Sequence, residues 1–153
     1  MSNAIQNFGI IYNNPFVLGP LFPSFYKSLG EKPKGFLLSY LVLPLVLYPE
    51  SRAFLVRSKI TSSIRTLMNK RSRIYGLDER ITEYWGLTNK SFQHAVDIGV
   101  LEIDETLSVN VVSDWPPDPV FVPDQITAAS HLGLLFNPFD VPTIYRMLGV
   151  KKL

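Results

Sequence analysis

The sequence contains no cysteine, so its two histidines are the first candidates for catalysis or metal binding. His94 and Asp97 stand three positions apart, so a helix would place them on one face as half of a metal site or an acid–base pair. No further ligand is indicated by spacing, and a hydrogen-bonded or surface pair is the favoured interpretation. His131 lies among Ala, Leu and Gly residues, which is typical of a packed histidine. The sequence therefore predicts no catalytic residue and no metal site.

The motifs of common enzyme sites are missing as well. The sequence has no GxxxxGK[ST] loop, no GxGxxG after a predicted strand and no GxSxG elbow. The absence of cysteine excludes a disulfide scaffold, a thiolate zinc site and an iron–sulfur cluster. Glu102, Asp104 and Glu105 would be capable of binding a cation, but a solvated turn is the favoured interpretation. We expect no enzyme, no cofactor and no small-molecule substrate.

One stretch of the chain carries basic residues and no acid. Between Ser51 and Leu77, apolar residues recur at Ile60, Ile64, Leu67 and Met68 with the spacing of an amphipathic helix. The bases either form the solvated face of that helix or dock an acidic partner, which would be a protein or a phosphate backbone. These candidate contact residues are Arg52, Arg57, Lys59, Arg65, Lys70, Arg71 and Arg73.

The formal net charge of +2 hides a strong polarity along the chain. Residues 1–96 carry 12 Lys/Arg and 5 Asp/Glu, a charge of +7, whereas residues 97–153 carry 3 and 8, a charge of −5. The two halves sum to the stated +2. Such asymmetry indicates oriented binding to partners.

The most organised segment, 77–112, has the order of a winged helix-turn-helix. One helix is predicted up to Trp85, a turn at Gly86, a second helix that starts at the N-cap Thr88, and then a β-hairpin around an acidic turn. The second helix exposes Lys90 and Gln93 but few positive charges, so reading of DNA by this unit is disfavoured. Docking to a protein fits the charges better.

The predicted fold class is mainly α (α+β), a helical bundle that contains the winged helix-turn-helix-like unit with its single hairpin. We expect a single domain, 1–153, made of a helical part (13–70), the winged-helix-like part (77–112), a Pro-rich connector (114–123) that Trp115 pins to the body, and C-terminal helices (124–149).

The N-terminal helical part has two notable predicted helices. Pro20 and Pro23 are expected to break a helix over 16–29. The apolar run Phe36–Tyr48 is 13 residues long, about 20 Å as a helix and too short for a membrane span, so we expect a buried helix in a cytoplasmic protein.

Several stretches, in this order, resemble the middle component of ABC-three component (ABC-3C) systems. The resemblance covers nearly the whole chain. Its motifs are the segments 14–19 (NPFVLG), 41–47 (LVLPLVL) with 51–55 (SRAFL), 128–133 (AASHLG) and 144–150 (IYRMLGV).

The resemblance implies a small, non-enzymatic accessory subunit that bridges an SMC/Rad50-like ABC ATPase and a separate effector subunit in bacterial antiviral defence of the Lamassu kind. Non-specific DNA contact within that complex stays open, and no membrane is expected. The alternative is a stand-alone winged-helix DNA-binding transcriptional regulator that reads DNA with Lys90 and Gln93. A metal-assisted hydrolase around His94 and Asp97 is the third and least favoured hypothesis.

Overall fold

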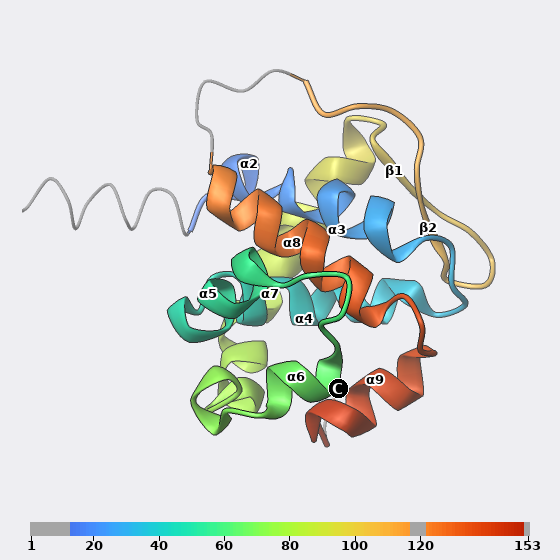
Figure 1. Cartoon of the computed structure of the whole chain (residues 1–153). Helices are drawn as coiled ribbons and strands as arrows, with labels where there is room; N and C mark the ends of the chain where they lie inside the picture. Colours follow the sequence, from blue (N-terminus) through green and yellow to red (C-terminus); the bar gives the residue numbers. More distant parts are fainter. Residues whose placement is uncertain (1–12, 117–121, 152–153) are drawn as a thin grey trace, which may run out of the picture.

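A computed structural model describes residues 13–116 and 122–151 (Figure 1). These residues are mainly helical, with one two-stranded antiparallel sheet, which confirms the mainly α (α+β) class with one hairpin. The α-helices are α2 (Pro15–Leu18), α3 (Leu21–Leu29), α4 (Ser39–Val46), α5 (Pro49–Arg57), α6 (Ile64–Met68), α7 (Leu77–Asp97), α8 (Pro123–Phe136) and α9 (Val141–Leu148). Short 3₁₀ helices are η1 (Gly35–Leu38) and η2 (Arg71–Arg73), and the strands are β1 (Leu101–Ile103) and β2 (Val109–Val111).

The first predicted helix is broken, as expected, but only once. The Asn14 side chain accepts a hydrogen bond from the Phe16 N–H at 2.9 Å and begins α2. The break falls at Pro20, between α2 and α3. Pro23 lies in the first turn of α3, where a missing N–H costs no intrahelical hydrogen bond, so it does not break the helix.

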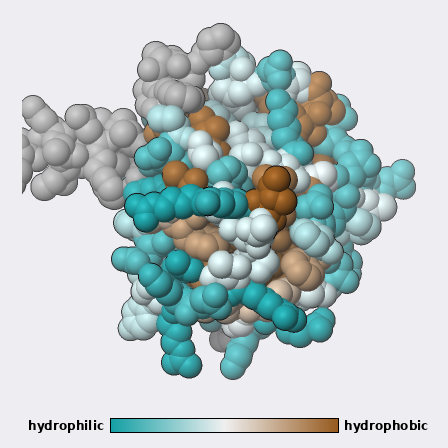
Figure 2. All heavy atoms as spheres, viewed as in Figure 1, coloured by the Kyte–Doolittle hydropathy of each residue, from teal (hydrophilic) through white to brown (hydrophobic). Residues whose placement is uncertain are grey.

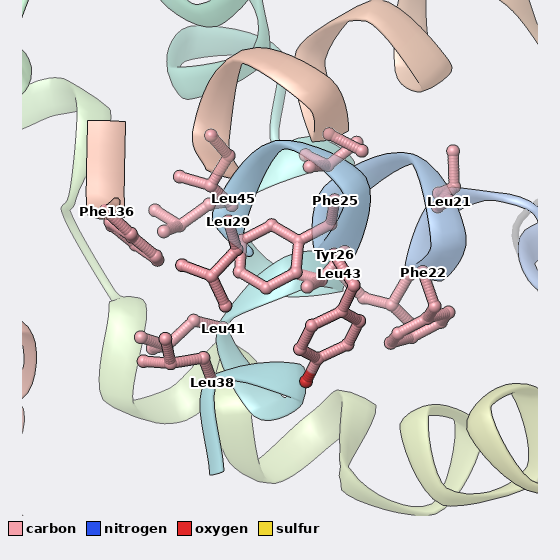
Figure 3. Close-up of a cluster of buried hydrophobic side chains, with 14 of the residues drawn as sticks. Leu21, Phe22, Phe25, Tyr26, Leu29, Leu38, Leu41, Leu43, Leu45 and Phe136 are labelled. Carbon is pink, nitrogen blue, oxygen red and sulfur yellow. The ribbon is translucent and has the colours of Figure 1, made fainter. Parts of the chain in front are cut away.

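The core lies where α3, α4 and α8 meet, and Figure 3 shows their side chains in one cluster. Every residue of α4 is buried, as predicted for the run Phe36–Tyr48. The helices α3 and α8 form the most extensive contact between any two elements in the described part of the chain. Phe25 and Phe136 join them through an edge-to-face ring contact with centroids 6.0 Å apart.

The predicted helix-turn-helix is wrong, because α7 is one continuous helix from Leu77 to Asp97. Gly86 is exposed within this helix and costs only about 1 kcal/mol of helix stability relative to Ala. This cost is too small to break a helix whose residues before and after Gly86 pack on other elements. Trp85 stacks on Tyr40 with centroids 3.9 Å apart, and Phe92 is buried one turn beyond Thr88. Thr88 is itself buried inside the helix rather than capping it.

The hairpin, the pinning of the connector and the C-terminal helices follow the predictions. Strands β1 and β2 pair with Leu101 opposite Val111. Trp115 packs on the core, and its ring lies so close to Gly19 that a Cβ there would come within 2.3 Å of it. The side chain of Asp140 accepts a hydrogen bond from the Thr143 N–H at 2.9 Å and begins α9.

Some predictions about domain organisation are not decided by these elements. The connector prediction falls partly on residues 117–121, outside the described residues. The single domain 1–153 stays a prediction. No helix over 13–116 or 122–151 combines the length and apolarity that crossing a bilayer requires.

Candidate partner-binding surface

The acid-free segment is not one amphipathic helix, so that prediction is wrong. It comprises the end of α5, a loop over residues 58–63, α6 and η2. A capping box starts α6, because Ser63 Oγ accepts from the Thr66 N–H at 3.3 Å and Thr66 Oγ1 accepts from the Ser63 N–H at 3.2 Å. Ile64 is buried behind this cap, whereas Ile60 in the loop is 103% exposed. A cap therefore begins the helix four residues later than hydrophobic spacing suggested.

Three of the seven predicted bases meet around one hollow, which we call the basic hollow. Arg57, Lys70 and Arg73 line it together with the hydroxyl-bearing Ser58 and Ser62, and its volume is about 300 Å³. Its other lining residues are Glu50, Ala53 and Phe54. Three positive charges against the one carboxylate of Glu50 make this hollow a candidate site for an anionic group.

Arg73 is held in a fixed position at the basic hollow. Its Nη1 donates to the Thr66 carbonyl at 2.9 Å, and its guanidinium lies 4.3 Å from the centroid of the Phe54 ring. A guanidinium held at two points loses little further freedom when it binds a carboxylate or a phosphate. This residue is therefore preorganised for an anion.

The other bases of the segment have different roles. Arg52 is half-buried and donates from Nη1 to the Leu47 carbonyl at 3.1 Å, so it stabilises the C-terminal end of α4. Lys59 lies in the loop after α5, Arg65 on α6 and Arg71 on η2, and all three side chains are exposed. The structure therefore divides the seven bases into a candidate anion site, a helix cap and a surrounding positive surface.

Within residues 13–116 and 122–151, carboxylates do not neutralise six of these seven bases. Over the described ranges 13–116 and 122–151 the one ion pair joins Lys27 Nζ to Asp114 Oδ1 at 3.4 Å, away from this segment. Six of the seven predicted bases thus have no carboxylate of the described chain within 4.0 Å: Arg57, Lys59, Arg65, Lys70, Arg71 and Arg73. Their charge is available to an acidic partner.

A second hollow adjoins the first, and we call it the apolar hollow after its exposed aliphatic side chains. Its lining residues are Ser58, Lys59, Ile60, Ser62, His131, Leu134 and Leu135. It has a volume of about 350 Å³, and its exposed hydrophobic side chains are Ile60 and Leu134, the latter 56% exposed. Ser58 and Ser62 line both hollows, which places the two on either side of the loop 58–63. Hydrophobic side chains gather near the centre of this face, over α8 and that loop, with hydrophilic side chains around them (Figure 2).

Sequence reasoning missed the apolar hollow. Ile60 had the spacing of a core residue, and Leu134 belongs to α8, far away in sequence. His131, which also lines this hollow, approaches the Leu55 carbonyl through Nδ1 at 2.6 Å and so connects α8 to α5. No local pattern in the sequence indicates this meeting of α8 with the loop.

The histidine–aspartate pair of the sequence does not form an acid–base unit. His94 makes edge-to-face contacts with Phe16, at 4.6 Å between centroids, and with Trp115, at 5.5 Å. Asp97 instead accepts a hydrogen bond from Gln93 Nε2 at 2.8 Å. Within the part of the chain that the structure describes, no three His, Asp or Glu residues are grouped so that they could hold a metal ion.

The acidic turn of the hairpin is closed by its own hydrogen bonds. Asp104 Oδ1 accepts from the backbone N–H groups of Thr106, at 2.8 Å, and Ser108, at 3.1 Å. The Thr106 hydroxyl also donates to it, and these bonds lower the pKa of Asp104. Glu102 and Glu105 flank it as exposed side chains, in agreement with a solvated turn.

Comparison with known protein families yields a match. The family model described as ABC-three component (ABC-3C) system Middle Component 3 matches residues 2–152 of the chain. No curated protein and no solved structure matches. The matched range includes α2 to α9 with the hairpin and both hollows, so it covers all the elements described above.

Proposed function

The chain belongs to the Middle Component 3 family of ABC-three component systems, and from this membership we propose that it is a non-enzymatic accessory subunit. In this role it bridges the SMC/Rad50-like ABC ATPase of its system and a separate effector, and the assembly defends bacteria against phages or plasmids. The chain itself supplies binding surfaces, whereas nucleotide hydrolysis and the effector's chemistry belong to the other two components.

The positions of the residues with catalytic potential support a non-enzymatic role. His94 lies between two aromatic rings, and the ring nitrogen of His131 is engaged by a backbone carbonyl. Asp104 is occupied by the hydrogen bonds of its own turn. These three side chains take part in packing or in local hydrogen bonds, which favours structural roles over that of a general acid or base.

One observation carries the bridging role: four bases without an ion-pair partner in the described chain line two adjoining hollows, one of which also holds the exposed Ile60. These bases are Arg57, Lys59, Lys70 and Arg73. Unneutralised charge beside an exposed apolar side chain is typical of a surface that is covered in a complex. Opposite charge on the partner would steer the encounter, and the apolar contact would slow dissociation.

The alternative role, a stand-alone DNA-binding regulator, loses the element on which it depended. Lys90 and Gln93 lie in the middle of the single helix α7 and not on a separate recognition helix after a turn. No observation favours that role over an accessory subunit.

Co-expression of the three components of the system tests the proposal. With an affinity tag on the ATPase, we expect this chain to co-elute in a fixed ratio through affinity and size-exclusion chromatography. A complex of ATPase and effector that forms fully while this chain elutes alone would refute the bridging role.

A further inference from the structure

We infer that the basic hollow and the apolar hollow form one composite site for a protein segment in which an apolar side chain stands next to acidic residues. This inference rests on the proposed function, and it specifies the chemistry of the partner segment and the surface that holds it. The bound segment would place its apolar side chain against Ile60 and Leu134 and its carboxylates against Arg57, Lys70 and Arg73.

The two hollows are adjacent enough to bind one segment. Ser58 and Ser62 contribute to both linings, so the loop 58–63 lies between the two hollows. Lys59 lines the apolar side of this loop and Arg57 the basic side. A peptide a few residues long can therefore reach both linings at once.

The apolar half has an anchoring point that the fold leaves uncovered. Ile60 is 103% exposed and Leu134 is 56% exposed, and both line the same hollow. Scattered exposed hydrophobic residues need no explanation, but two large ones facing one hollow beside a charged rim form a patch typical of an interface. The neighbouring Leu135 is buried in the core and also lines this hollow, so it attaches the patch to the core.

The basic half is arranged for carboxylates. Arg73 is held by the Thr66 carbonyl and the Phe54 ring, and Lys70 is an exposed cation that lines the same hollow. Ser62 Oγ accepts from the Lys59 N–H at 2.9 Å, which leaves its own proton free to donate to an acidic side chain. Glu50 on the rim repels a carboxylate placed next to it, so it restricts where the acidic residues of the segment can lie.

These features favour an acidic protein segment over nucleic acid. A phosphate backbone offers no apolar group to cover Ile60, and Glu50 would repel a track of phosphates passing over the basic hollow. Single-stranded nucleic acid is bound through aromatic platforms, and the exposed hydrophobic side chains of the apolar hollow are aliphatic.

The test measures binding of this chain to the ATPase component of its own system with three variants. Ile60→Asp with Leu134→Asp alters the apolar half, and Arg57→Glu with Lys70→Glu alters the basic half. The matched control combines Val112→Asp with Lys90→Glu and Lys151→Glu, which changes an exposed apolar residue and two exposed bases outside both hollows and outside the acid-free segment. Thermal melting of each purified variant establishes that it folds.

We expect each site variant to weaken the complex by at least about tenfold, and the control to change it by less than about threefold. If the wild-type chain forms no complex, the proposed function itself fails. If the complex forms and the site variants bind as tightly as the wild type, only the composite site is refuted.

Two further measurements distinguish an acidic protein segment from the other two possible occupants, nucleic acid and a second copy of the chain. The first measures binding of the chain to a 30-base-pair DNA duplex. If the wild type binds the duplex, the basic variant does not, and the apolar variant still binds the ATPase normally, the site binds phosphates and the inference is overturned. The second measures the oligomeric state. If the wild-type chain self-associates and the apolar variant is monomeric, the site binds a second copy of the chain, and the inference is again overturned. We expect neither result.

Discussion

Gly133 sets how closely α3 and α8 approach, so Gly133→Ala is the most direct test of the core. A Cβ at this position would lie 2.3 Å from the Phe25 carbonyl oxygen and 2.9 Å from the Leu29 nitrogen. Both are backbone atoms of α3, which cannot rotate away as a side chain could. An ordinary carbon–oxygen contact needs about 3.3 Å, so the two helices would have to separate by about 1 Å.

The expected destabilisation follows from two opposing terms. Overpacking a core costs about 1–3 kcal/mol, and we take about 3–5 kcal/mol here because the obstructing atoms belong to the backbone. Alanine recovers about 1 kcal/mol of helix propensity relative to glycine. The net loss in free energy of unfolding is therefore about 2–4 kcal/mol, which lowers the midpoint of thermal unfolding by about 4–16 °C for a chain of this size.

Calorimetry or urea unfolding monitored by circular dichroism measures this loss. The matched control is Gly86→Ala, also within a helix, where an added Cβ meets nothing within 4 Å. This control should raise the free energy of unfolding by up to about 1 kcal/mol. A Gly133→Ala protein as stable as the wild type would refute the close helix contact.

The remaining predictions concern Arg80 and Tyr145, which donate hydrogen bonds to backbone carbonyls of α4 and η1, and the glycine Gly86. Arg80 donates from Nε to the Pro44 carbonyl at 3.0 Å and lies 3.7 Å from the centroid of the Tyr48 ring. Arg80→Ala should therefore lower the free energy of unfolding by about 2–3 kcal/mol in urea titrations, and Arg80→Lys should recover less than half of this loss. Burial raises the pKa of Tyr145, which donates to the Leu37 carbonyl, above that of an unfolded tyrosine. The folded state thus holds this proton more tightly, so the contribution of Tyr145 to stability should be constant with pH up to about 10 and be lost above it. The fall in stability above a pH of about 10 should therefore be less steep in Tyr145→Phe. Gly86→Ala should also leave binding to the ATPase unchanged, because Gly86 lines neither hollow.

Local signals in the sequence predicted the elements whose ends are set by neighbouring residues. Asn14 and Pro15 at the start of α2, and Pro142 and Gly149 around α9, act within one turn of the helix that they delimit. Gly86 misled the prediction because its cost as a helix residue is small beside the packing of Trp85 and other α7 residues on distant elements.

The binding surface was predictable in charge but not in shape. Counting residues was enough to find the acid-free stretch, since charge is a property of composition. Arg57 meets Lys70 and Arg73 only because η2 packs back on α5, and Ile60 meets Leu134 only through α8. Contacts between elements separated by a dozen residues or more leave no periodic pattern in the sequence.

The contact between α3 and α8 also determines the order in which the chain can acquire its core. Ser28 and Ser130, whose hydroxyls are hydrogen-bonded at 2.9 Å across this contact, stand 102 positions apart. At about 5–20 residues per second, a ribosome needs about 5–20 s to make the intervening chain. During that interval the apolar face of α3 is without its largest partner, so the newly made N-terminal part must shield Phe25 and Leu29 by other contacts or by a chaperone.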